Sequence, residues 1–301
     1  MVNGPLRHVA IDPVVPERPI VEPAQGTPTE ATPTTSSGSG SNDSLRQWVV
    51  VASAVVGIAV AFLGSGAVVG TPVNKVADGA YATDATLVAP AGSAFSIWGV
   101  IYTGLALLAA FQLMASRRSD PRQRRVGWLV AASLIINAAW VTAVQLEWLW
   151  ISVVLIVALA WVLVVALVRL GESRPSSRYE AVVVDGTMGL YLGWACIATV
   201  ANIAAVLVAS GVTAEGGRAT AWSVAVLVVA GVVGVVLAVG LKGRLAPAIG
   251  LAWGLTWVAV ARTSGVPESR ATAVAAVLAA LVTVVSAVVV RARSSERTRV
   301  G

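Results

Sequence analysis

Apolar stretches without a single charged residue follow one another along the chain from Trp48 onward. They cover residues 48–70, 95–115, 127–146, 148–168, 186–210, 219–241, 245–261 and 271–290. A helix rises about 1.5 Å per residue, so about 20 residues cross the roughly 30 Å of hydrocarbon in a bilayer. The pattern therefore predicts eight transmembrane helices, of which residues 245–261 form the shortest. A β-barrel would need alternating polar positions, and residues 224–239 show none.

Basic residues between these stretches predict the orientation of the chain. Eight crossings put both termini on one side, together with the loops after the second, fourth and sixth stretches. That side carries 17 of the 21 Lys and Arg residues, against 4 on the other side. Because basic residues near membrane spans stay inside the cell, we expect a multi-pass protein of the cytoplasmic membrane with both termini cytoplasmic.

The two ends of the chain differ in composition from the apolar region. Residues 1–47 hold seven of the 13 prolines, followed by a run rich in Ser, Gly and Thr. Such a segment buries too little apolar surface to offset its ordering entropy, so we expect a disordered cytoplasmic tail. Residues 291–301 are predicted to form a short basic cytoplasmic tail.

Overall composition narrows the function classes. Hydrophobic residues make up 57% of the chain and charged residues 12%, about half the share in soluble domains, so a soluble globular protein is excluded. The net charge of +6 lies in short clusters between apolar runs, which argues against nucleic acid as a partner. One cysteine and one histidine cannot form a Cys/His metal site, and we expect no metal.

Enzyme signatures and midplane charges are also missing from the sequence. The motifs H-E-x-x-H, G-x-S-x-G and the Walker loop do not occur, so we predict that the chain is not an enzyme. Ion-coupled carriers place ionisable residues at membrane depth. Asp185 comes closest, but we interpret it as an interfacial residue near Arg174 and Arg178 at the start of a helix.

Aromatic and amide side chains inside three spans are the candidate binding residues. The predicted topology places four of them in the outer half of the membrane and two near its middle. In order along the chain they are Trp98, Tyr102, Asn137, Trp140, Trp194 and Asn202. Packing and interhelical hydrogen bonds are one interpretation of each. Together they favour an apolar cavity that opens outward and contains a few orienting polar groups. Trp148 and Trp222 lie at span ends, where indoles belong at headgroup level.

Three motifs in the same order resemble the tryptophan-rich sensory protein family, also called the translocator protein or peripheral benzodiazepine receptor (TspO/MBR) family. Residues 89–102, APAGSAFSIWGVIY, resemble the family's entry into its second helix. Residues 137–140 resemble its N-x-x-W, and residues 191–202 resemble its pattern of Tyr-Leu, Trp, Ala-Thr and Asn. The resemblance covers residues 48–210, a five-helix core, and leaves residues 211–290 as three additional transmembrane helices.

The resemblance implies a five-helix bundle whose pocket binds porphyrins and other flat apolar ligands. It also implies a lid formed by the loop between the first two helices, and a homodimer. Carried over to this chain, Trp98, Asn137, Trp140 and Trp194 line the pocket, and Tyr102 and Asn202 join them.

We therefore expect an all-α, polytopic integral membrane helix bundle that binds or senses a hydrophobic, porphyrin-like ligand. Membrane lipids are the other expected partners, and no cofactor is required. The alternative is a membrane carrier for a small hydrophobic compound, not coupled to ions through midplane charges. An enzyme acting on a bound tetrapyrrole is a third hypothesis, for which only indole photochemistry is available among these residues.

Overall fold

The computed structural model describes residues 37–64, 71–212 and 214–300, together with Met1 and Gly4. The chain from Ser37 onward forms one compact unit. Most of the predicted disordered tail, residues 1–47, lies outside the described residues. Its last part does not fit the prediction, because residues 37–47 are already helical.

Helices account for most of the described unit, and its described residues form no strand. Eight of them are long: α1 (Ser37–Leu63), α2 (Ile97–Leu113), α3 (Pro121–Gln145), α4 (Leu149–Leu170), α6 (Thr187–Ala209), α7 (Gly216–Gly240), α8 (Leu245–Ser264) and α9 (Arg270–Val300). The short ones are η1 (Val73–Gly79), η2 (Gly92–Ser96), η3 (Ala115–Arg117), α5 (Arg178–Glu180) and the π-helical η4 (Ala181–Gly186).

The described residues provide eight segments long and apolar enough to cross a membrane, each of 20 to 32 residues. The predicted all-α polytopic bundle is confirmed. The seventh segment, α8, is three residues longer at its C-terminal end than the sequence pattern suggested.

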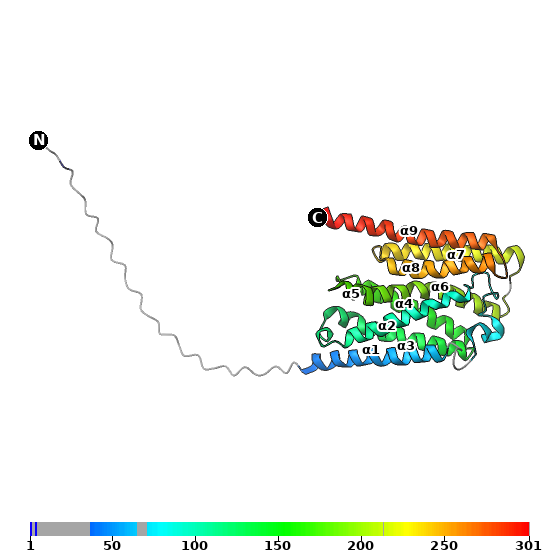
Figure 1. Ribbon diagram of the computed structural model, residues 1–301, viewed down its shortest axis with the longest axis horizontal. Coiled ribbons are helices and arrows are strands. Elements are labelled where there is room, and N and C mark those ends of the chain that lie inside the picture. Colours follow the sequence, from blue (N-terminus) through cyan, green and yellow to red (C-terminus); the bar gives the residue numbers. More distant parts are fainter. Residues whose placement is uncertain (2–3, 5–36, 65–70, 213, 301) are drawn as a thin grey trace. The chain divides into compact units, whose positions relative to one another are not determined.

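The long helices lie side by side, and their order in space departs from their order in the chain (Figure 1). Helix α3 packs between α1 and α4, α4 packs on α6, and α6 packs on α8. Helices α7 and α8 then pack on α9. We call the end of the bundle where α1 begins and α9 ends the terminal end, and the opposite end, which carries residues 71–91, the loop end.

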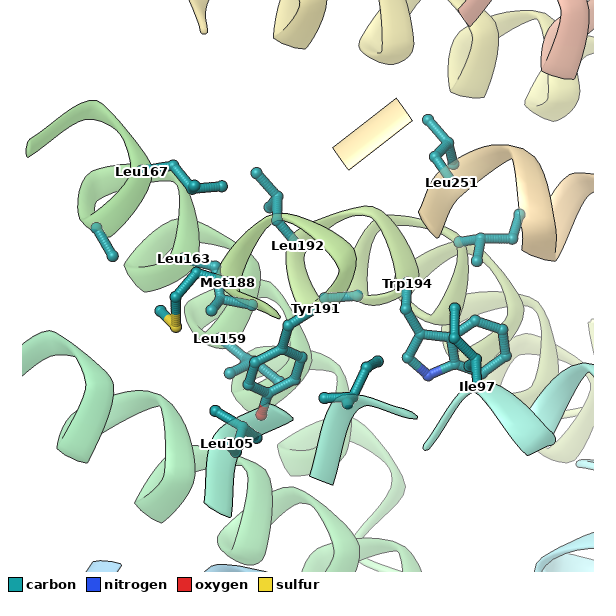
Figure 2. Close-up of a cluster of buried hydrophobic side chains, with 14 of the residues drawn as sticks. Ile97, Leu105, Leu159, Leu163, Leu167, Met188, Tyr191, Leu192, Trp194 and Leu251 are labelled. Atoms are coloured by element: carbon teal, nitrogen blue, oxygen red, sulfur yellow. The ribbon is translucent and has the colours of Figure 1, made fainter. Parts of the chain in front are cut away.

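A buried cluster with side chains from α2, α4, α6 and α8 fills the centre of the bundle (Figure 2). Leu105, Leu163, Tyr191 and Trp194 are each at most 2% exposed. In a membrane such a cluster is held by close packing, because lipid tails are as apolar as the side chains.

Helices α6 and α8 approach each other through glycines. A Cβ atom at Gly193 would lie 2.6 Å from the backbone nitrogen of Leu251, and one at Gly250 would lie 3.0 Å from that of Trp194. Side chains would force the two helices apart, so the G-x-x-x-G spacing of each helix serves packing within the chain. Helix α8 is thereby fixed tightly to the core.

The terminal end contains the first of two buried charge clusters, and this cluster explains the early start of α1. Asp43 on α1 accepts from Arg124 Nε at 2.8 Å, and Arg46 Nη2 donates to the carbonyl of Arg118 at 2.8 Å. Asp43 is 6% exposed and Arg46 is 1% exposed. These contacts compensate for ordering a polar segment that the sequence pattern alone assigns to the tail.

The second cluster contains Asp185, near the start of the helical segment Arg178–Ala209. Arg122 donates to Glu180 at 2.9 Å and to both carboxylate oxygens of Asp185 at 2.7 and 2.8 Å, and Arg244 also donates to Asp185. The π-helical turn between Glu180 and Asp185 bonds residue i to residue i+5, which brings two residues five positions apart onto one face. Helices α3, α6 and α8 are thus joined at the terminal end.

Candidate functional site

A small apolar cavity lies at the loop end, between the loop of residues 71–91 and helices α3 and α6. Its volume is about 50 Å³. The loop contributes Tyr81 and Thr86, η2 contributes Phe95, and the helices contribute Trp140, Trp194 and Asn202. The sequence predicted a cavity among the second, third and fifth spans, and these lining residues come from the same three spans and the loop before them.

The loop is shaped by a left-handed turn held by the end of α3. Ala77, Asp78 and Gly79 have φ angles of 51°, 53° and 82°. A left-handed conformation costs a residue with a side chain about 1–2 kcal/mol, so the turn needs outside support. Glu147 supplies part of it by accepting from the backbone nitrogen of Ala77 at 3.2 Å. Gln145 contributes by donating to the carbonyl of Thr71 at 2.9 Å.

Tyr81 reaches from this loop to a polar group at the cavity wall. Its hydroxyl donates to Asn202 Oδ1 at 3.3 Å and lies 3.4 Å from Ser152 Oγ. Trp140 Nε1 also donates to Asn202 Oδ1, and Asn202 Nδ2 donates to Ser152 Oγ at 3.0 Å. Burial raises the pKa of Tyr81, opposed by its hydrogen bond with Ser152. The loop is thus closed over the cavity by a neutral hydroxyl.

An aromatic group lies beside the cavity, around Trp194. The Trp98 ring stacks on Tyr102 at 4.9 Å and meets Trp194 edge-on at 6.1 Å. The Phe95 ring also meets Trp194 edge-on, with the two centroids 5.6 Å apart. Asn137 Nδ2 donates to the Tyr102 hydroxyl at 3.2 Å. Trp194 thus touches Trp98 of the stacked pair and also lines the cavity.

The six residues named from the sequence therefore fall into two sets. Trp140, Trp194 and Asn202 line the cavity. The other three are not among the lining residues: Trp98 contacts Trp194, Tyr102 stacks on Trp98, and Asn137 bonds to Tyr102.

Sequence reasoning missed Tyr81 and Ser152. Tyr81 lies in an irregular loop, where the rise per residue of a helix cannot be used to predict a residue's depth in the membrane. Ser152 is a small polar residue in an otherwise apolar span. The signal that could have found Tyr81 was its place in the loop that the family resemblance makes a lid.

Several buried polar atoms around the cavity have no hydrogen-bond partner among the described residues. Trp194 Nε1 and Thr86 Oγ1 belong to residues that line it, and Asn137 Oδ1 belongs to the residue bonded to Tyr102. A donor or acceptor buried without a partner costs about 1–3 kcal/mol. A bound molecule with a polar group could recover that cost. No cluster of three or more His, Cys, Asp or Glu side chains suited to a metal occurs in the described part of the chain.

Comparison with known families decides the family of the chain. The model of the family described as TSPO-like protein matches residues 47–289. The chain belongs to the TSPO-like protein family. The match extends through α7, α8 and most of α9, so it includes the helices that the motif resemblance left outside the core. No curated protein and no solved structure matches the chain.

Proposed function

We propose that this TSPO-like membrane protein binds a hydrophobic, porphyrin-like ligand in the cavity at the loop end. The observation that supports this proposal is the lining of the cavity. The indoles of Trp140 and Trp194 and the ring of Phe95 surround it, and Asn202 adds one amide. Flat aromatic faces with a single orienting polar group suit a planar apolar molecule.

On this proposal, the small cavity corresponds to a closed conformation. Ligand pockets usually enclose about 300–1,000 Å³, whereas this cavity has about 50 Å³. A porphyrin needs the loop to move away from α6, which breaks the hydrogen bonds of Tyr81. Binding is therefore coupled to opening of the loop, and the affinity measured is reduced by the fraction of closed protein.

The unpartnered atoms support a ligand that carries a polar group at its edge. Trp194 Nε1 can only donate, so it requires an acceptor. A carbonyl or carboxylate oxygen on the edge of a flat molecule provides one, and the carboxylates of a porphyrin fit this requirement. Thr86 Oγ1 can serve as donor or acceptor for the same group.

The charge cluster at the terminal end favours binding over passage through the bundle. A carrier has to open at both ends. Arg122 joins α3 to Glu180 and Asp185 there, and Arg244 joins α8 to the same carboxylate. Buried ion pairs of this kind are costly to break, so we expect ligand to enter and leave at the loop end. With the orientation predicted from the basic residues, this end faces outward.

Titration of the purified full-length protein with protoporphyrin, followed by tryptophan emission, tests the proposal. We expect saturable quenching at micromolar ligand. A variant with Trp148 and Trp222 replaced by Leu serves as the control, because both indoles are more than half exposed at span ends. It should bind as the unaltered chain does. No saturable quenching, or an equal loss of affinity in this control and in a Trp140/Trp194 variant, would overturn the proposal.

A further inference from the structure

We propose that the loop-end half of α8 positions the loop wall of the ligand cavity, with Arg262 as the main positioning residue. Helix α8 belongs to the three C-terminal helices and contributes no residue to the cavity lining given above. Its role is to hold residues 83–94, a segment that supplies part of that lining. This inference rests on the proposed function, because it concerns access to the same cavity.

Arg262 is the strongest contact between α8 and the loop. Its side chain is buried, with the residue only 1% exposed. Nη2 donates to the carbonyl of Thr83 at 2.6 Å and Nη1 donates to the carbonyl of Pro267 at 2.8 Å. Hydrogen bonds from a charged donor are about twice as strong as neutral ones. The guanidinium therefore joins the loop to the segment that connects α8 with α9.

Two tryptophans earlier on α8 extend this contact. Trp253 Nε1 donates to the carbonyl of Ala94 at 2.9 Å, and the carbonyl of Trp257 accepts from the backbone nitrogen of Ala91 at 3.1 Å. Together with Arg262 they bracket residues 83–94 at both ends. Within that segment Thr86, Ala89 and Pro90 line the cavity.

The loop is consequently held on two sides by different parts of the chain. Gln145 at the end of α3 and Glu147 in the turn that follows it hold its first part, residues 71–77. Helix α8 holds its last part, and α8 is itself fixed to α6 by the glycine contacts. Tyr81 lies between the two anchors, so releasing either one gives its side chain freedom to leave the cavity.

Loss of the α8 anchor should raise the fraction of protein in which the loop is open. The Arg262→Gln variant should therefore speed association of protoporphyrin about three- to tenfold and strengthen its apparent affinity in proportion. Arg262→Lys keeps one charged donor and should restore part of the difference. Arg218→Gln is the matched control, since Arg218 is an exposed arginine at the same end of the bundle. It should leave the association rate and the affinity unchanged.

A ligand-free measurement separates this inference from the proposed function. In a Cys196→Ala background, a spin label at Asp84 reports loop motion, and a label at Glu215 reports motion of another loop at the same end. Arg262→Gln should increase mobility at position 84 and leave position 215 unchanged. General destabilisation would mobilise both labels. Absence of porphyrin binding would defeat the proposed function, and the label at position 84 would still decide whether α8 positions the loop.

The inference is overturned if the label at position 84 and the association rate are the same in Arg262→Gln as in the parent. If that variant fails to insert, Trp253→Phe provides the test. It removes only the donor to Ala94 and keeps an aromatic ring in place. Faster association and a more mobile label at position 84 in Trp253→Phe support the role of α8, and unchanged values refute it.

Discussion

Replacing Tyr81 by Phe should make ligand binding faster and tighter. The substitution removes the hydroxyl that closes the loop and keeps the ring. The hydroxyl has one proton to donate, to Asn202 Oδ1 at 3.3 Å, and it lies 3.4 Å from Ser152 Oγ. Such a hydrogen bond contributes about 0.5–1.5 kcal/mol net. The closed state should lose that amount.

The substitution measures the loss of the Tyr81 hydroxyl alone, because Asn202 and Ser152 keep other hydrogen-bond partners. Asn202 Oδ1 keeps the donor Trp140 Nε1 at 3.3 Å, and Ser152 Oγ keeps its hydrogen bonds with Asn202 and with the carbonyl of Leu149. The free energy needed to open the loop should therefore fall by the full amount of about 0.5–1.5 kcal/mol. This fall corresponds to an increase of about 2- to 13-fold in apparent affinity when the closed state dominates.

Stopped-flow quenching of tryptophan emission by protoporphyrin measures this effect. Tyr179→Phe is the control, because Tyr179 is 52% exposed and packs on Phe111 away from the cavity. The reasoning would be refuted if Tyr81→Phe weakened binding, since the hydroxyl would then contact the ligand. An unchanged association rate would equally refute it, since the loop would not limit entry.

The pH dependence of association gives a second measurement on the same residue. Burial raises the pKa of Tyr81, so closure favours the neutral hydroxyl. The stability of the closed loop is complete below the ordinary tyrosine pKa of about 10 and declines as the pH rises above it. Association with the parent protein should therefore accelerate above a pH of about 10. The Tyr81→Phe variant should not show this acceleration, and equal acceleration in both would exclude Tyr81 as its cause.

Three further predictions concern the pocket, the terminal end and the orientation. Trp194→Leu should lower the affinity for porphyrin by about 2- to 13-fold through lost stacking. Trp98→Leu should lower it less, because Trp98 contacts Trp194 and does not line the cavity. Equal losses of affinity in the two titrations would contradict the division into two sets. Arg122→Met should lower the free energy of unfolding by about 3–5 kcal/mol because it leaves the buried carboxylate of Glu180 without its arginine partner, although Asp185 keeps Arg244. Arg125→Met, in an exposed pair, should lower it by less than about 1 kcal/mol. Denaturation in detergent micelles compares the two variants, and similar values would show that the buried cluster contributes little. A reporter fused after Gly301 should behave as cytoplasmic, and an external signal would reverse the orientation proposed from the basic residues.

The positions of the spans followed from the sequence because apolar length is a direct physical requirement of the bilayer. The rise per residue also placed Trp140, Trp194 and Asn202 at overlapping depths without any knowledge of helix packing. Charged positions were harder to assign. Asp43 and Arg122 are buried in pairs that join helices far apart in the chain, and a polar residue at a span end has the same sequence signature whether it is paired or solvated.

Which residues face the cavity was decided only by the tertiary structure. In a soluble helix the apolar stripe shows which side of the helix faces the interior. In a membrane both the lipid and the protein interior are apolar, so the pattern shows how deep a residue lies but not which way its side chain faces. Trp98 and Trp194 accordingly looked equivalent in the sequence, yet only Trp194 lines the cavity. The contacts of Tyr81 and Arg262 depend on where an irregular loop folds back, which no helical or strand period encodes.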